Sequence, residues 1–227
     1  MLIGQEITVL GAGIGGLAAS IALAMRGARV TVLEQAPNVR EVGAGIQISP
    51  NGLVVLDALG VGDRMRDVCP RSHAVTLHDG LTGERVIRLD LAGQRPEQEF
   101  LLVHRADIIT ILLERAEEVG VSVETTRRVT HVGIGDRVTL EIGGEGPRDG
   151  ACEPSFTGQV AWRAIVPATG DEPQEARVFM GPGRHFVTYP LRDRSIVNIV
   201  AVEERATWAA EGWHHEDDPE NLRRAFS

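Results

Sequence analysis

The chain has 227 residues, 43% of them hydrophobic, which is enough for one sizeable core or two modest cores that share a boundary. A net charge of -9 and an isoelectric point near 5.3 make nucleic acid a poor candidate partner. Two cysteines without a C-x-x-C spacing exclude a disulfide framework or a zinc site built on them. The sequence starts on an apolar strand with no basic leader, and no apolar run reaches the roughly 20 residues that cross a bilayer, so we expect a soluble, cytoplasmic protein.

The first 34 residues predict a strand, a glycine turn, a helix and a second strand. Ile7–Leu10 is a short apolar run typical of a buried parallel strand. Apolar residues then recur at helical spacing from Ile14 to Met25, and the helix is expected to stop at Gly27. Val30–Glu34 forms the next strand. This order is that of a right-handed βαβ unit.

The turn between the first strand and the helix carries a dinucleotide fingerprint. Gly11 permits the sharp turn, Gly13 lets the backbone approach a pyrophosphate, and Gly16 allows the helix to pack closely on the strands. The helix that opens at Ile14 points its free N–H groups at the phosphates. Glu34, at the end of the second strand, can accept hydrogen bonds from both ribose hydroxyls. The pattern therefore predicts binding of the ADP half of a dinucleotide and leaves both FAD and NAD open.

The remaining elements change from mixed helix and strand to strand alone after about residue 128. The first group consists of a helix after Ser49-Pro50, a strand hairpin over Ala74–Leu91, a helix over Asp107–Glu118 and a strand over Val121–Glu124. The later strands are predicted at Val129–Ile134, Arg137–Ile142, Val160–Val166, Arg177–Met180, His185–Leu191 and Ile196–Val202. A last helix is expected after Asp217 or Asp218, with Pro219 in its first turn.

Four later segments are distinctive when taken together. They are Glu41–Gly52 (EVGAGIQISPNG), Val103–Ile108 (VHRADI), Phe156–Ala164 (FTGQVAWRA) and Gly181–Leu191 (GPGRHFVTYPL). They resemble the FAD-dependent aromatic hydroxylases, the class A flavoprotein monooxygenases, and most of all the branch that contains salicylate hydroxylase and 3-hydroxybenzoate 6-hydroxylase. The resemblance covers nearly the whole chain. It implies FAD as the cofactor and NAD(P)H as a co-substrate.

The resemblance also implies an α/β fold, the aromatic hydroxylase fold in part. Residues 1–73 and 100–150 would form a Rossmann-like, discontinuous FAD-binding domain. Residues 74–99 and 151–227 would form a substrate-binding β-sheet domain whose C-terminal part is missing. The expected partners are a small aromatic substrate, O2 and NAD(P)H, with neither nucleic acid nor membrane, and a homodimer is one allowed assembly.

Residue roles also follow from the resemblance. Glu34 would hold the adenosine ribose, while Arg40, Gln47 and Arg105 would line the pyrophosphate, the ribityl chain and the flavin edge. The alternative for the last three is that they are solvated loop or helix-entry residues.

His185 and Tyr189 are the candidate catalytic residues. They lie four apart in one predicted strand, so their side chains project to the same side. The resemblance implies that this side faces the aromatic substrate, where a histidine can take a phenolic proton and a tyrosine hydroxyl can orient the ring. The alternative is that both are hydrogen-bonded packing residues of the sheet.

The run from Trp213 to Asp218 contains His214 and His215, which suggests a metal site. Adjacent histidines point in different directions, however, so we predict a solvated turn and no metal.

Two segments typical of the family are missing. An Asp-Gly segment of the form G-A-D-G-x-x-S-x-V-R is expected between Glu141 and Phe156, where only Asp149-Gly150 occurs, and a Gly-Asp segment would lie beyond Ser227. We expect an incomplete record of a longer enzyme rather than a truncated form. The leading hypothesis is an FAD-dependent monooxygenase that hydroxylates a phenolic or aromatic acid with NAD(P)H and O2. The alternatives are an NAD-dependent Rossmann dehydrogenase and a non-catalytic nucleotide-binding fragment.

Overall fold

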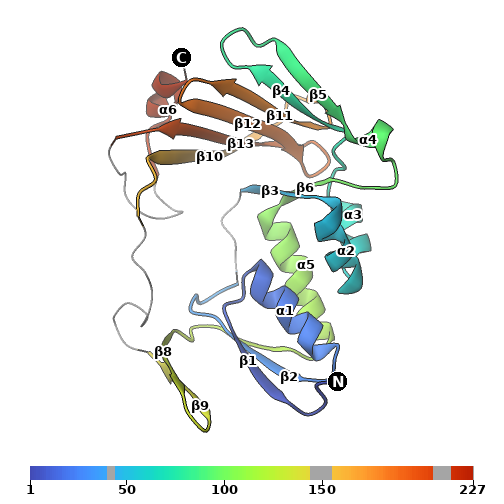
Figure 1. Cartoon of the computed structure of the whole chain (residues 1–227), viewed down its shortest axis with the longest axis vertical. Coiled ribbons are helices and arrows are strands. Elements are labelled where there is room, and N and C mark those ends of the chain that lie inside the picture. The colour runs from blue at the N-terminus through green and yellow to red at the C-terminus, as the bar shows by residue number, and fades with distance from the viewer. Residues whose placement is uncertain (40–43, 144–154, 207–215, 227) are drawn as a thin grey trace. The chain divides into compact units, whose positions relative to one another are not determined.

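Residues 1–39, 44–143, 155–206 and 216–226 are described by the structure, a computed structural model (Figure 1). The chain divides into two units. The first contains residues 1–41, 56–62 and 106–154, and the second contains residues 42–55, 63–105 and 155–227. Both units are discontinuous in sequence, because the chain passes between them several times.

The first unit is built on a parallel three-stranded sheet with the order β1 (Glu6–Leu10), β2 (Arg29–Leu33) and β7 (Ser122–Glu124). Helix α1 (Ile14–Ala24) connects the first two strands and buries Leu17 and Ile21 completely. Their spacing of four residues puts them on one face of the helix. Helix α5 (Arg105–Glu118) leads into β7, and an antiparallel hairpin of β8 (Val129–Ile134) and β9 (Val138–Ile142) follows it.

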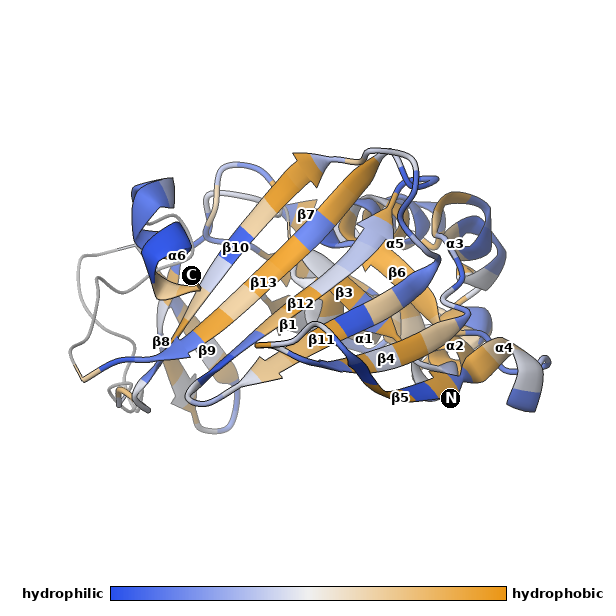
Figure 2. Ribbon diagram, turned by 90° about the horizontal axis from the view of Figure 1, so that it is seen from above, coloured by the Kyte–Doolittle hydropathy of each residue, from blue (hydrophilic) through white to orange (hydrophobic). Residues whose placement is uncertain are grey.

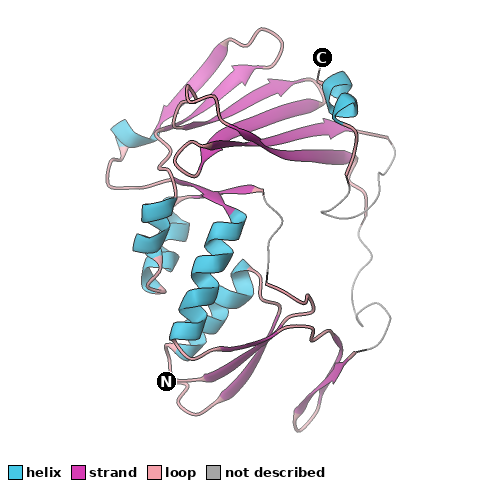
Figure 3. Ribbon diagram, turned by 180° about the vertical axis from the view of Figure 1, so that it is seen from behind, coloured by secondary structure: helices cyan, strands magenta, loops and turns pink. Residues whose placement is uncertain are grey.

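The second unit is built on a six-stranded sheet (Figures 2 and 3). Its order is β10 (Gln159–Pro167), β13 (Ile196–Glu204), β12 (Arg184–Leu191), β11 (Glu175–Gly181), β4 (Ala74–Asp79) and β5 (Arg85–Asp90). Strands β11 and β4 are parallel and all other neighbours are antiparallel. Because side chains alternate along each strand, the register assigns every residue to one of two faces.

One face of the large sheet carries the core of the second unit. The buried residues of this core are Leu102, Ala176, Tyr189 and Leu191. Leu102 comes from a separate two-stranded ribbon of β3 (Gly45–Ile48) and β6 (Leu101–His104), so the ribbon packs against the sheet. We call this side of the sheet the inner face. The ribbon places Gly45, the first residue of β3, against the buried side chains of Tyr189 and Asn198.

Four short helices complete the described elements. They are α2 (Pro50–Ala58), α3 (Gly62–Val68), α4 (Leu91–Gln94) and α6 (Pro219–Ala225). Asp218 caps α6 by accepting the N–H of Glu220, and Phe226, which follows the helix, packs edge-on against Phe186. None of the helices in the described ranges has the length and apolar character that crossing a membrane requires.

Most predicted elements are present with shifts of one or two residues at their ends, and four short ones are additional: β3, α3, α4 and β6. Strand β3 lies before Ser49, in a stretch for which neither helix nor strand was predicted. The predicted domains would assign residues 42–55, 63–73 and 100–105 to the FAD-binding domain. In the structure these segments cluster with the large sheet, because β6 carries Leu102 into its core.

Candidate functional site

The loop from β1 to α1 has the backbone of a phosphate-binding turn. Gly11 has φ +95, a left-handed conformation that side chains rarely adopt. A Cβ added to Gly16 would lie 1.9 Å from the carbonyl oxygen of Gly11, so only glycine lets the helix start this close to the strand. A Cβ on Gly13 would meet no atom within 4 Å, which leaves the backbone open to a ligand. Gly13 caps α1 without a side-chain hydrogen bond, so the N–H groups of the first turn are available for phosphate oxygens.

Glu34 follows β2 and ties the glycine turn to the end of that strand. One carboxylate oxygen accepts the N–H of Ala12 and the other accepts the N–H of Ala36, both at 2.8 Å. Each oxygen keeps a lone pair for a further donor such as a ribose hydroxyl. A cavity of about 210 Å³ opens beside the carboxylate and is also lined by Gly11, Arg127 and His131. The first unit thus brings the turn and the acid to one place, as a fit to the adenosine end of FAD requires.

In the second unit, Tyr189 is the best buried of the predicted site residues, at 4% exposure. It lies on the inner face against Gly45 of β3, where a Cβ would stand 2.5 Å from the tyrosine hydroxyl. Asn198, its partner on the neighbouring strand β13, has no exposed surface and accepts the N–H of Gly45 at 2.6 Å. Position 45 of β3 therefore requires glycine, because a side chain there would occupy the space of the Tyr189 phenol and the Asn198 carboxamide.

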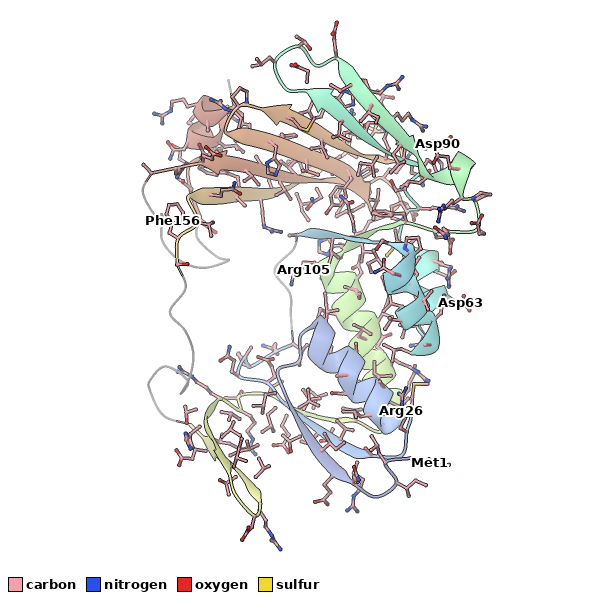
Figure 4. The ribbon with its side chains drawn as sticks, viewed as in Figure 1. Met1, Arg26, Asp63, Asp90, Arg105 and Phe156 are labelled. Atoms are coloured by element: carbon pink, nitrogen blue, oxygen red, sulfur yellow. The ribbon has the colours of Figure 1, made fainter. Side chains whose placement is uncertain are left out.

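The charges around Tyr189 are positive. Burial raises the pKa of Tyr189 to about 12, and the neighbouring Arg163 opposes that shift. The pKa of Arg163 is lowered, first by burial and second by Arg105, while Tyr189 acts in the opposite direction. Arg105 opens α5, as Figure 4 shows, and its N–H donates to the carbonyl of Ala44 at 3.0 Å. The phenol is consequently neutral near pH 7, and the charge that acts on it is the guanidinium group of Arg163, of the kind that binds carboxylates.

His185 lies on the same strand and the same face as Tyr189, but the strand does not bring the two residues together. Four residues of extended chain separate their Cα atoms by about 13 Å. His185 is half-buried and lines an open hollow of about 360 Å³ with Val178, Met180 and Val202. The hollow therefore lies at the more exposed end of the inner face, and Tyr189 lies at the buried end of the same face.

The other predicted residues are distributed over both units. Gln47 lies in β3, half-buried and paired with Leu102, so it belongs to the second unit with Arg105. Arg40 lies outside the described residues, as do Asp149-Gly150 and the two adjacent histidines of the predicted solvated turn.

Sequence reasoning gave Arg163 and Asn198 no role. Arg163 stood inside a quoted segment, and Asn198 interrupts an apolar strand, IVNIVAV, which is the signal that could have revealed it.

We predict that Tyr189 titrates near pH 12 and makes the protein less stable in alkali. The pKa of about 12 lies above the ordinary 10.0, so between these values the folded chain keeps a proton that the unfolded chain loses. The contribution of Tyr189 to the free energy of unfolding should be constant below pH 10 and fall by about 3 kcal/mol as pH rises from 10 through 12. Urea unfolding and the ultraviolet absorbance of the phenolate measure both effects, because Tyr189 is the only tyrosine and the sequence has no lysine.

The control for this prediction is Tyr189→Phe, which keeps the ring and removes the ionisable hydroxyl. Its stability should change little over the same pH range. A wild-type phenol that titrates near pH 10 would contradict the prediction.

Comparison with known proteins identifies the cofactor. The sequence profile of a family described as FAD binding domain matches residues 5–148. The 3-hydroxybenzoate 6-hydroxylase of Polaromonas naphthalenivorans is 35% identical over 86% of this chain and 55% of its own length. The 3-amino-4-hydroxybenzoate 2-monooxygenase of Streptomyces cremeus is 32% identical over 97% of this chain and 61% of its own length. The chain spans little more than half the length of such relatives.

Solved structures give the same fold. CtdE in complex with FAD and a substrate superposes with a TM-score of 0.84 at 18% identity, covering 98% of this chain and 62% of that one. HpxO of Klebsiella pneumoniae, complexed with FAD and uric acid, has a TM-score of 0.78 at 22% identity, again covering 98% and 62%. The predicted α/β fold is confirmed, and of the two dinucleotides left open by the fingerprint the match selects FAD over NAD. The chain therefore belongs to the FAD binding domain family.

Proposed function

We propose that this chain is the FAD-binding and substrate-sheet part of a monooxygenase that hydroxylates a phenolic or aromatic acid with NAD(P)H and O2. The observation that carries the proposal is the inner face of the sheet, where a neutral buried phenol packs against Gly45 of β3 and is acted on by the charge of Arg163. An aromatic ring fits an apolar face, and a guanidinium group matches its carboxylate. The names of the relatives, hydroxylases and monooxygenases of substituted benzoates, point to the same substrate class.

FAD, when bound, supplies the redox and oxygen chemistry, and the protein supplies binding, orientation and exclusion of water. The turn from Gly11 to Gly16 would hold the pyrophosphate and Glu34 the adenosine ribose. Arg40, Gln47 and Arg105 would line the rest of the cofactor. Each of these contacts uses a backbone N–H, a carboxylate or a side-chain donor of a type that matches the cofactor atom.

The inner face would handle the substrate. Arg163 would bind the carboxylate, and Tyr189, protonated near pH 7, would donate a hydrogen bond that orients the ring. Since a neutral phenol is a poor base, the phenolic proton needs another acceptor, for which His185 is the predicted residue. Its Cα lies about 13 Å from that of Tyr189, so the proton would reach it by way of solvent. Loss of that proton makes the ring electron-rich, which is what an electrophilic oxygen requires. The cytoplasmic location and the homodimer stay predictions.

The test begins with FAD binding and ends with product. The chain should bind FAD and become yellow. In the longer protein that contains this chain, 3-hydroxybenzoate should raise the rate of NAD(P)H oxidation with formation of a dihydroxybenzoate. Glu34→Gln should weaken FAD binding about tenfold or more, because a charge-assisted hydrogen bond to a hydroxyl is replaced by a weaker neutral one. Flavin fluorescence measures the affinity, and chromatography of the aromatic acids measures the product.

The matched control is Glu117→Gln, which makes the same change at an exposed position of α5 and should leave FAD affinity unaltered. Bound FAD without any hydroxylated product in that longer protein would overturn the proposed activity in favour of a non-catalytic nucleotide-binding role. A colourless chain stabilised by NAD would overturn the cofactor assignment.

A further inference from the structure

Asn198 is a fully buried polar residue in the first seven residues of β13, which are otherwise apolar. Its neighbours across the sheet are Tyr189 on β12 and Ile165 on β10, so all three side chains project toward the inner face. Burying a carboxamide is unfavourable unless its oxygen and its nitrogen both find partners. The partners of the two ends therefore show what this residue contributes.

The oxygen end is bonded and the nitrogen end is not. Gly45 N–H can only donate, so its bond to Oδ1 fixes which end of the carboxamide faces β3. Nδ2 has no hydrogen-bond partner in the part of the chain that the structure describes. An unsatisfied buried donor costs at least as much as one net hydrogen bond contributes. Stability alone thus does not account for asparagine at this position.

The bond to Gly45 does account for the position of the tyrosine. A Cβ on Gly45 would lie 2.5 Å from the hydroxyl of Tyr189 and 2.8 Å from Cγ of Asn198. The phenol and the carboxamide therefore rest side by side on the same backbone atom. Any change that lets the backbone of Gly45 move also changes the surface against which the phenol is packed.

We propose that Asn198 is a positioning residue for Tyr189. By holding Gly45 against the sheet, it fixes the phenol hydroxyl at the inner face, where the aromatic acid would be oriented. The link to the aromatic acid rests on the proposed function, whereas the positioning of Tyr189 does not. The other charged groups that act on this phenol or its neighbour, Arg163 and Arg105, are unchanged in the variants below, so they affect all proteins alike.

The alkaline titration of the only tyrosine tests the proposal directly. Asn198→Ala removes the bond and opens space for water, which solvates the phenolate, so the midpoint should move from about 12 toward 10. Asn198→Asp keeps an oxygen for Gly45 N–H but places a carboxylate beside the phenol, so the midpoint should rise. The two substitutions should thus shift the midpoint in opposite directions, Asn198→Ala through solvation and Asn198→Asp through charge.

Thr76→Val is the matched control. It deletes another fully buried polar group of the same sheet, and the register puts Thr76 on the side opposite Tyr189. The midpoint of this variant should equal that of the wild type. A midpoint of Asn198→Ala equal to that of the wild type would overturn the proposal. If Asn198→Ala does not fold, Asn198→Ser, whose side chain is too short to reach Gly45 N–H, replaces it and should also lower the midpoint.

A binding measurement tests the link to the ligand. Titrating FAD-loaded protein with 3-hydroxybenzoate, and following the flavin absorbance, should show affinity reduced about tenfold in Asn198→Ala, the effect of one lost net hydrogen bond. Unchanged affinity together with a shifted titration would overturn this part of the proposal. A wild type that does not bind 3-hydroxybenzoate contradicts the proposed function instead, and the titration still decides the role of Asn198.

Discussion

Gly16→Ala should destabilise the chain by about 3 kcal/mol and abolish measurable FAD binding, because the new Cβ would stand 1.9 Å from the carbonyl oxygen of Gly11. That oxygen belongs to the backbone at the end of β1, so it cannot move aside as the tip of a side chain can. Helix α1 must shift away from the strand instead. The shift moves the first-turn N–H groups from the place where they would meet the pyrophosphate.

Gly15→Ala is the matched control for this prediction. Gly15 is the neighbouring residue in the same helix, and its Cβ would meet nothing within 4 Å. Alanine is the better helix former, so stability should stay the same or rise by up to about 0.5–1 kcal/mol. Thermal unfolding and flavin fluorescence measure both variants. Equal effects of the two substitutions would show that the close contact between helix and strand does not matter.

The first unit could be predicted in detail because its signals are local. Leu17 and Ile21 repeat at helical spacing, and a single short turn carries Gly11 and Gly16. The fingerprint sets a requirement on backbone geometry that only glycine meets, so composition and structure correspond residue by residue. Glu34 also followed from this local logic, and the structure places its carboxylate on the turn.

The ribbon of β3 and β6 could not be predicted in the same way. Each strand has four residues, and a short apolar run such as Leu101–His104 does not distinguish strand from helix by periodicity. The two strands pair across more than fifty residues of intervening chain, as Gly45 with His104 shows. Their formation depends on tertiary pairing and on the inner face that Leu102 covers, neither of which is visible in a local window.

The candidate substrate site was predicted in part for the same reason. Strand alternation correctly put His185 and Tyr189 on one side, because the register runs unbroken from Arg184 to Leu191. The alternation could not show that the buried end meets a glycine strand from a distant segment. The partners of Tyr189, Asn198 and Gly45, become evident only when the ribbon is placed on the sheet.

Gly45→Ala should destabilise the chain by about 2–3 kcal/mol, since its Cβ would lie 2.5 to 2.8 Å from three atoms of two buried side chains, Tyr189 and Asn198. Urea unfolding measures the cost. Gly181→Ala, in the same unit, is the control, because its Cβ would be 3.5 Å from the nearest atom, an ordinary contact. It should therefore change stability little.

A double substitution separates this specific clash from a general weakness of β3. In a Tyr189→Leu background the ring and its hydroxyl are gone, so adding Gly45→Ala should cost less than it does in the wild type, with a coupling on the order of 1–2 kcal/mol. Strictly additive effects would mean that the phenol is not packed on Gly45. Coupling would show that Gly45 and Tyr189, 144 positions apart in the sequence, depend on each other. Residue 45 has to be small so that the phenol of Tyr189 can be buried at the inner face.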